Sequence, residues 1–307
     1  MFREIQEVME LLESARVKGK TLQVWLQENG VKNVEVTRVE GEEGSTEFVR
    51  VTIVSHQRGG PTLGIIGRLG GVGARPHRLG LVSDADGAII ALACAAKLAR
   101  MAANGDALPG NVIVATHICP TAPIIPHEPT SFMGSPVDMA TMNRYEVDPA
   151  MDAILSIDTT KGNWIVNHRG FAITPTVKEG YILRASDTLL DIMRIVLNEP
   201  PVVLPITTQD ITPYGNDLYH INSIMQPATA TVAPVVGVAT TASTPIPGSA
   251  SGANQPFCLE MTARFCVEVA KAFTAGTCCF YDENEFSRVV SLYGSMRHLQ
   301  TLGRKRG

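Results

Sequence analysis

The chain has 307 residues, of which 45% are hydrophobic and 18% are charged, and its formal net charge is −4 at pH 7. This length and apolar content allow a large buried core and argue against a disordered chain. The negative net charge argues against nucleic acid as a partner, because domains that bind phosphate backbones carry a clustered basic excess. The low charge content is typical of a surface partly covered by other subunits, so we expect a homo-oligomer.

The N-terminal segment indicates the compartment. Residues 1–7 are charged and amphipathic, unlike a signal peptide, and no apolar run in the chain approaches the ~18 residues that span a membrane. The six cysteines form no Cys-x-x-Cys motif, so we expect buried, reduced thiols. The sequence therefore predicts a cytoplasmic protein with no membrane partner.

In chain order, the first predicted elements are two helices and a β-hairpin. Residues 2–14 and 20–28 are predicted to be helical, because the apolar residues of the first segment recur at helical spacing. Residues 33–39 and 46–54 alternate between apolar and polar side chains. This period of two predicts a hairpin with one solvent-exposed face.

The rest of the chain alternates short apolar runs with helical segments. Strands covered on both faces are predicted at residues 62–66, 111–116, 153–157 and 235–238, and helices at residues 85–103, 186–198 and 256–274. This alternation predicts an α/β fold with three α/β/α layers and a mostly parallel central sheet. We expect a single domain over residues 1–307, with N-terminal helices in 1–30, a core in 60–275 and a C-terminal helix in 283–302.

Polar side chains follow several predicted strands. Arg68, His117 and Asp158 each come directly after an apolar run, and Asp84 precedes a predicted helix. Ligands of open α/β sheets bind beyond the carboxyl ends of the strands, so we expect these four side chains to converge on one site. Two other interpretations stay open: Asp84 could cap the helix, and His117 could be a core histidine bonded to backbone.

The loop between the first core strand and its helix concentrates positive charge. Arg68, Arg75, His77 and Arg78 are predicted to bind an anionic group of a substrate. Farther along, His127 and Glu128 are weaker candidates in a proline-rich loop.

These motifs together resemble the co-catalytic zinc exopeptidases, the superfamily of glutamyl aminopeptidase-like hydrolases. The resemblance spans about residues 60–275 and rests on residues 65–70 (IIGRLG), 83–87 (SDADG), 117–119 (HIC), 153–158 (AILSID) and 215–217 (GND). It implies that Asp84 and Asp158 are metal ligands, that Asp86 is a catalytic acid beside them, and that Asp217 contacts the substrate. For Asp217 a plain turn is the competing interpretation.

The sequence also departs from the exopeptidase pattern. Arg68 stands where the family has its first histidine, Gly70 stands where it has an aspartate, and residues 240–256 lack the final histidine. His117 could replace a missing ligand, giving a site for one divalent metal such as zinc with Asp84, His117 and Asp158 as ligands. Because an arginine cannot bind a metal, a site without metal is the alternative.

We therefore expect a hydrolase-like protein that acts on a small peptide, an amide or a carboxylated metabolite, with His117 as general base or ligand. The alternative is a non-catalytic protein that binds or senses a small molecule and has lost the metal ligands of a peptidase fold. The whole chain also resembles an uncharacterised family of bacterial and archaeal proteins, domain of unknown function 1177, which implies no mechanism.

Overall fold

The computed structural model describes the whole chain except residues 56–58, 69, 127–130, 162–163, 219, 221–222, 247–251 and 304–307. Its helices are α1 (Phe2–Glu13), α2 (Gly19–Glu28), α3 (Asp86–Ala103), α4 (Met139–Glu146), α5 (Asp187–Leu197), α6 (Pro256–Thr274) and α7 (Glu283–Tyr293). Short 3-10 helices are η1 (Ser83–Ala85), η2 (Gln209–Ile211), η3 (Gln226–Thr229) and η4 (Arg297–Gln300). In the described part of the chain, no helix is both long and apolar enough to cross a membrane.

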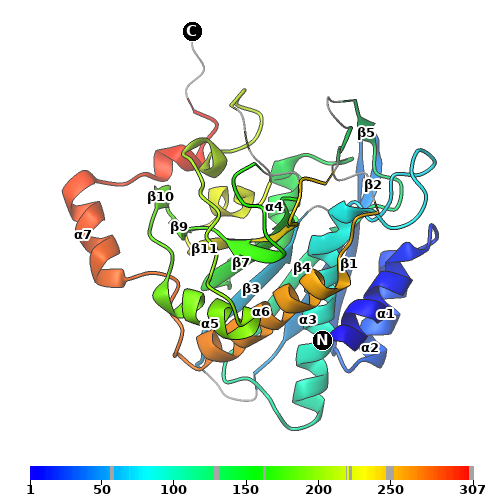
Figure 1. Cartoon of the computed structure of the whole chain (residues 1–307), viewed down its shortest axis with the longest axis horizontal. Coiled ribbons are helices and arrows are strands. Elements are labelled where there is room, and N and C mark those ends of the chain that lie inside the picture. The colour runs from blue at the N-terminus through cyan, green and yellow to red at the C-terminus, as the bar shows by residue number, and fades with distance from the viewer. Residues whose placement is uncertain are drawn as a thin grey trace.

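One sheet forms the centre of the molecule (Figure 1). Its strands are β1 (Asn33–Gly41), β2 (Gly44–Ile53), β3 (Leu63–Gly67), β4 (Val112–Ile118), β7 (Ala153–Thr159), β8 (Gly170–Ile173), β9 (Val177–Lys178), β10 (Tyr181–Ile182) and β11 (Val235–Thr241). The strand order is β1-β2-β4-β3-β7-β11-β9-β10, and β8 pairs with β11. A separate ladder joins β5 (Ile124–Ile125) to β6 (Phe132–Met133).

The α/β fold predicted from the sequence is confirmed, with a parallel centre and antiparallel flanks. Strands β4, β3, β7 and β11 run parallel, and they are the four apolar runs of the sequence. The predicted hairpin β1–β2 joins this centre through β2, which runs antiparallel to β4. On the other side β8 and β9 pair with β11 antiparallel. Parallel order is therefore confined to strands linked by crossover connections.

Alternate residues of the central strands enter two different cores. Ile65 and Leu155 face the core shared with α1, α3, α5 and α6, whereas Ile66 and Ile154 face the opposite side. Helices cover the first face closely (Figure 1). The second core is completed mainly by loop and 3-10 residues such as Ile211, Ile224 and Met225. Both faces are buried, which is why these strands are continuously apolar.

Two glycines bring the start of α3 against the end of β3. A Cβ atom on Gly67 would lie 2.3 Å from the carbonyl oxygen of Gly87, and one on Gly87 would lie 2.3 Å from that of Arg68. No larger residue fits either position without moving the helix. This close approach places η1 and the first turn of α3 at the carboxyl edge of the parallel strands.

The C-terminal helix predicted over residues 283–302 is divided in the structure. Helix α7 ends at Tyr293, where Gly294 adopts a φ of 80°, and η4 follows after a short connection. A positive φ ends a helix readily at glycine because glycine has no Cβ to clash.

Candidate functional site

Three aspartates meet at the carboxyl edge of the sheet, and we call Asp84, Asp86 and Asp158 the aspartate cluster. Asp158 lies near the end of β7, opposite Ala239 of β11. Asp84 lies in η1 and Asp86 begins α3. All three are buried, with exposed fractions of 3% for Asp84 and 0% for the other two. The end of β7 and the start of α3, both predicted from the sequence to lie at this edge, thus bring their carboxyl groups together.

Asp86 is fully engaged with neighbouring polar groups. Lys161 Nζ lies 2.5 Å from Asp86 Oδ2 and also donates to the carbonyl oxygen of Ala253 at 2.9 Å. Thr240 Oγ1 donates to the same Asp86 oxygen at 2.9 Å, and Asn254 Nδ2 donates to Oδ1 at 2.6 Å. Asp86, predicted as a catalytic acid, therefore joins α3 to β11 and to the segments after β7 and before α6.

Asp84 has no comparable set of partners. Its side chain does not cap α3, whose N-cap residue is Ala85. The buried Oδ1 atom of Asp84 has no hydrogen-bond partner among the described residues. Burial, and after it repulsion from Asp158 and Asp86, raises the pKa of Asp84 well above its usual value, against the attraction of Lys161. Burial therefore favours the neutral form of the Asp84 carboxyl group.

Asp158 is held by two hydrogen bonds. The Thr159 backbone N–H donates to Oδ1 at 2.7 Å, and Ser223 Oγ donates to Oδ2 at 2.9 Å. Burial raises the pKa of Asp158 to about 7, although these two hydrogen bonds and the charge of Arg68 oppose the shift. Near neutral pH the Asp158 carboxyl group can therefore gain or lose a proton.

Arg68 and His117 belong to a separate buried network with Glu146, the last residue of α4. Arg68 Nη1 donates to Glu146 Oε2, and His117 Nδ1 lies 2.5 Å from Glu146 Oε1. Burial alone would raise the pKa of Glu146, but Arg68 and His117 outweigh it and hold this pKa below its usual value. The guanidinium of Arg68 is 0% exposed. The structure thus places Arg68 in the interior, where it neutralises Glu146.

Both ring nitrogens of His117 are occupied. Nδ1 faces Glu146, and Nε2 accepts a hydrogen bond from the Gly70 backbone N–H at 3.2 Å. The ring also packs against Phe48, with centroids 5.3 Å apart. These contacts match the open interpretation of His117 as a core histidine. The structure does not bring His117 into the aspartate cluster.

Arg75, His77 and Arg78 are the loop residues predicted to bind an anion. None of their contacts described below is with the aspartate cluster. Arg75 donates to the carbonyl oxygens of Pro120 at 3.0 Å and Glu13 at 2.7 Å, so it ties the loop to the end of α1. His77 and Arg78 are exposed in the turn that follows. Arg75 therefore has a structural role, whereas His77 and Arg78 remain available at the surface.

Asp217 is exposed and adopts a φ of 60° in a turn. The preceding residue, Asn216, accepts a hydrogen bond from the Leu218 N–H at 3.2 Å, as in an Asx turn. The competing interpretation of this segment as a turn is thus the one that its contacts match. The other two candidates of the sequence, His127 and Glu128, lie outside the described residues.

The expected zinc ligands do not form one coordination set. Among residues that the structure describes, no group of three or more His, Cys, Asp or Glu side chains could hold a metal ion. His117 is engaged by Glu146, while Lys161 and Arg68 supply positive charge to Asp84 and Asp158. The donors present therefore do not fit a zinc ion bound by Asp84, His117 and Asp158.

Two charged residues of the buried networks were not predicted from the sequence. Lys161 is the positive partner of Asp86, and Glu146 is the negative partner of Arg68. Lys161 follows the end of β7 by two residues, so the signal that identified Asp158 could have found it. Glu146 lies at the end of an amphipathic helix, and no feature of the sequence shows that it turns inward.

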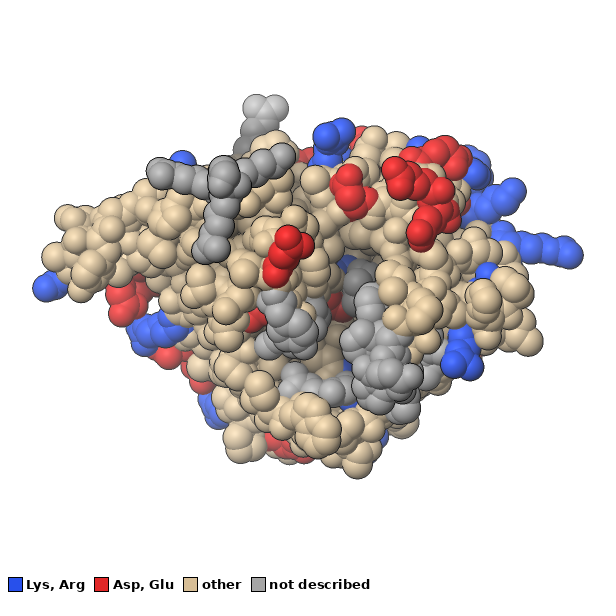
Figure 2. Space-filling model, turned by 90° about the horizontal axis from the view of Figure 1, so that it is seen from above, with Lys and Arg blue, Asp and Glu red and all other residues tan. Residues whose placement is uncertain are grey.

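Seen from above, the molecule is hollowed near its middle, with acidic atoms visible inside the hollow (Figure 2).

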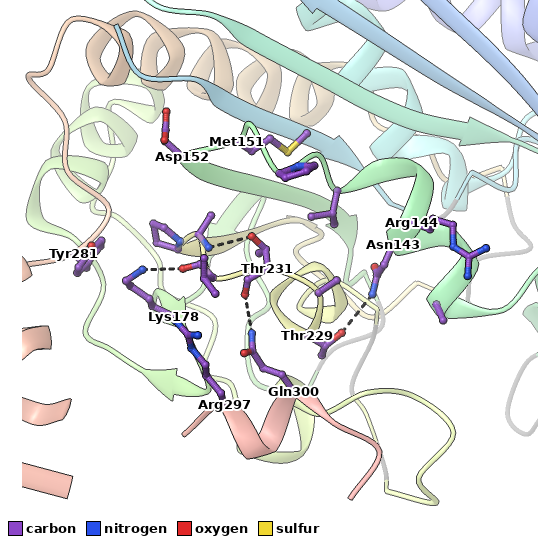
Figure 3. A pocket seen from close by; sticks show the side chains of 17 residues that line it. Asn143, Arg144, Met151, Asp152, Lys178, Thr229, Thr231, Tyr281, Arg297 and Gln300 are labelled. Carbon is purple, nitrogen blue, oxygen red and sulfur yellow. Dashed lines mark hydrogen bonds between the residues drawn. The ribbon is translucent and has the colours of Figure 1, made fainter. Parts of the chain in front are cut away.

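A large groove of about 980 Å³ lies elsewhere on the molecule, between α4, η4 and the segments that enter β7 and β11 (Figure 3). We call it the α4–η4 groove. Its wall includes Arg144, Lys178, Thr231, Tyr281 and Arg297. None of the site residues predicted from the sequence lines this groove.

Comparison with known proteins gives one family. The family described as "Protein of unknown function (DUF1177)" matches residues 37–303. No curated protein matches the chain.

Proposed function

The chain belongs to this DUF1177 family, which has no known function, and from the geometry of its site we propose that it is a hydrolase acting on a small peptide, amide or carboxylated metabolite. Asp84 and Asp158 are its acid–base pair. The observation that carries this proposal is the buried Asp84 carboxyl group, whose Oδ1 atom has no hydrogen-bond partner in the described part of the chain and lies near a second carboxyl group. Buried polar groups are normally paired, so an unpaired one indicates a place for a ligand.

The two carboxyl groups suit the two proton transfers of amide hydrolysis. Ionised Asp158 removes a proton from water, whose oxygen forms a bond to the amide carbon. Protonated Asp84 donates its proton to the amide nitrogen as the C–N bond breaks. Neighbouring carboxyl groups with unequal pKa values provide the base and the acid at one pH, which supports these roles. Proton exchange through solvent then restores the starting state.

Other residues support the pair without taking part in proton transfer. Ser223 and the Thr159 N–H orient Asp158, and the Lys161–Asp86 ion pair holds α3 in place beside it. The exposed side chains of His77 and Arg78 are the predicted contacts for an anionic substrate group. We place the substrate beside the carboxyl groups of Asp84 and Asp158.

A panel of peptides, N-acyl amino acids and simple amides tests this proposal. We expect turnover by the purified protein to fall by about 100-fold or more in Asp84→Asn and in Asp158→Asn, since each loses one proton transfer. Asp106→Asn, which changes an exposed aspartate after α3, is the matched control and keeps full activity. Equal activity in all four proteins would exclude the acid–base assignment.

A non-catalytic binding role is the second candidate. It is favoured by the deep burial of Asp84 and Asp158, which a bound molecule could reach only in part. In that case a compound from the same panel raises the melting temperature of the protein, the Asp84→Asn variant loses this effect, and no compound is hydrolysed.

We also propose a cytoplasmic location, supported by the state of the thiols. All six cysteines are free, and five of them are buried. Reduced thiols persist in the cytoplasm and are rare in secreted proteins.

A further inference from the structure

Helix α7 stands out because none of its residues is buried. It projects from the body at the side of the molecule (Figure 1). Its contacts with the rest of the chain lie near its two ends. The Phe286 ring meets the rings of Tyr181 and Tyr281 and the ammonium group of Lys178, and Glu285 pairs with Arg184 at 3.3 Å. Tyr181 Oη donates to the carbonyl oxygen of Gly294 at 2.5 Å. The helix is therefore attached at its base and at its end, with its sides open.

The open side of α7 is apolar. Leu292 is 62% exposed and Tyr293 is 75% exposed, and Val289 and Val290 are only half-buried. A short helix gains most of its stability from packing an apolar face against a partner. Within the described chain no such partner covers Leu292 and Tyr293.

The α4–η4 groove lies next to the base of this helix. Tyr281 directly precedes the N-cap of α7, Arg297 follows the helix, and both line the groove. Half-exposed Val232, with Pro234 and Val147, supplies apolar parts of the groove lining, beside polar residues such as Asn143 and Gln300. An amphipathic helix and a groove with both apolar and charged side chains thus lie next to each other on one chain.

Charge complementarity orients a helix in this groove. Lys178 and Arg297 already pair with Glu179, whereas Arg144 has no ion pair with any described residue (Figure 3). The first turn of α7 and its N-cap are acidic, with Asp282, Glu283 and Glu285, of which Glu285 already pairs with Arg184. The acidic end of α7 from a second copy therefore complements Arg144 in charge.

We propose that two copies of this chain form a dimer in which α7 of each copy occupies the α4–η4 groove of the other. Such a contact is reciprocal, as the two-fold symmetry of most dimers requires. It also covers the apolar side of α7 and pairs Arg144 with Glu283 of the second copy.

Light scattering on size-fractionated protein gives the first test. We expect wild-type protein to have twice the mass of the 33.0 kDa chain at micromolar concentration. The double variant Leu292→Asp, Tyr293→Asp becomes monomeric, whereas Leu79→Asp, which changes an 86% exposed leucine far along the chain, stays dimeric. A monomeric wild type, or a dimer that survives the α7 substitutions, overturns the proposal.

Mixing charge variants tests the reciprocal arrangement itself. Arg144→Glu and Glu283→Lys each place like charges at both contacts of a homodimer, so each weakens dimerisation by about tenfold or more. In a mixed dimer, one contact has the wild-type pair and the other has the exchanged pair. Mixing the two variants in equal amounts therefore restores the dimer. Failure of the mixture to recover, with both variants folded by circular dichroism, contradicts the exchange of α7.

Discussion

Lys161 and Asp86 form a buried ion pair, with Lys161 Nζ 2.5 Å from Asp86 Oδ2 and neither side chain more than 4% exposed. Asp86 begins α3 and Lys161 follows β7, so the pair joins the helix to the sheet beside Asp84. Buried ion pairs lose stability mainly when one partner is removed, because the remaining charge is left without compensation.

Replacing Lys161 by methionine should therefore destabilise the protein by about 3–5 kcal/mol. Urea unfolding of wild type and Lys161→Met measures the difference. The double variant Lys161→Met, Asp86→Asn, which leaves no buried charge, should recover part of the loss. A single variant as stable as wild type would show that the ion pair has no role in holding α3.

The raised pKa of Asp158 predicts that stability falls as pH rises. Its folded pKa of about 7 lies above the usual 3.8, so the folded state binds more protons than the unfolded state between these values. The free energy of unfolding contributed by this group therefore decreases from about pH 4 to about pH 7, by up to about 4 kcal/mol. In urea unfolding, Asp158→Asn should lose less stability than wild type when the pH is raised from about 4 to about 7. Parallel pH profiles would contradict the shift.

The lowered pKa of Glu146 predicts that its contribution to the free energy of unfolding increases with pH, opposite to that of Asp158. Its pKa lies below the usual 4.5, so its stabilising effect is present above that value and is lost as pH falls through the folded pKa. Glu146→Gln also leaves the buried Arg68 without a full counter-charge and should cost about 3–5 kcal/mol near neutral pH. Glu43→Gln, at an exposed position, is the control. The difference between wild type and Glu146→Gln should narrow on acidification, and a constant difference would argue against this role.

Gly87→Ala tests the close approach of α3 and β3. The added Cβ would lie 2.3 Å from the carbonyl oxygen of Arg68 and 2.8 Å from that of Ile157. We expect the helix start to shift and the protein to lose about 1–3 kcal/mol, despite the higher helix propensity of alanine. Gly252→Ala, whose Cβ would lie 3.6 Å from its nearest described neighbour, the carbonyl oxygen of Leu81, should be close to neutral in thermal unfolding. Equal melting temperatures of wild type and Gly87→Ala would show that the end of β3 tolerates the added methyl group.

The sequence was sufficient to predict the hairpin, the parallel strands and most of the long helices, but not α4 or the short strands β8 to β10. The parallel strands are the four apolar runs, because burial on both faces leaves a direct trace in composition. Asp84 and Asp158 were identified because they stand at strand and helix ends, where the chain must reach the edge of the sheet.

The direction in which the strand-end side chains point could not be predicted from the sequence. Arg68 and His117 also lie at the ends of strands, yet they face Glu146, which comes from a helix far along the chain. The partner of a buried charge is chosen by tertiary packing, and one sequence carries no signal for it. The same reason explains why Lys161 was missed as the partner of Asp86.

The proton on the carboxyl pair is the central feature of the proposed chemistry, and carboxyl ¹³C NMR of protein labelled at aspartate measures it directly. We expect one resonance that titrates near pH 7 and is absent from Asp158→Asn, and a second, from Asp84, that titrates well above the ordinary range of aspartate. If every aspartate carboxyl of the wild type titrated below about pH 5, in the ordinary range of exposed carboxylates, the acid–base pair would not exist.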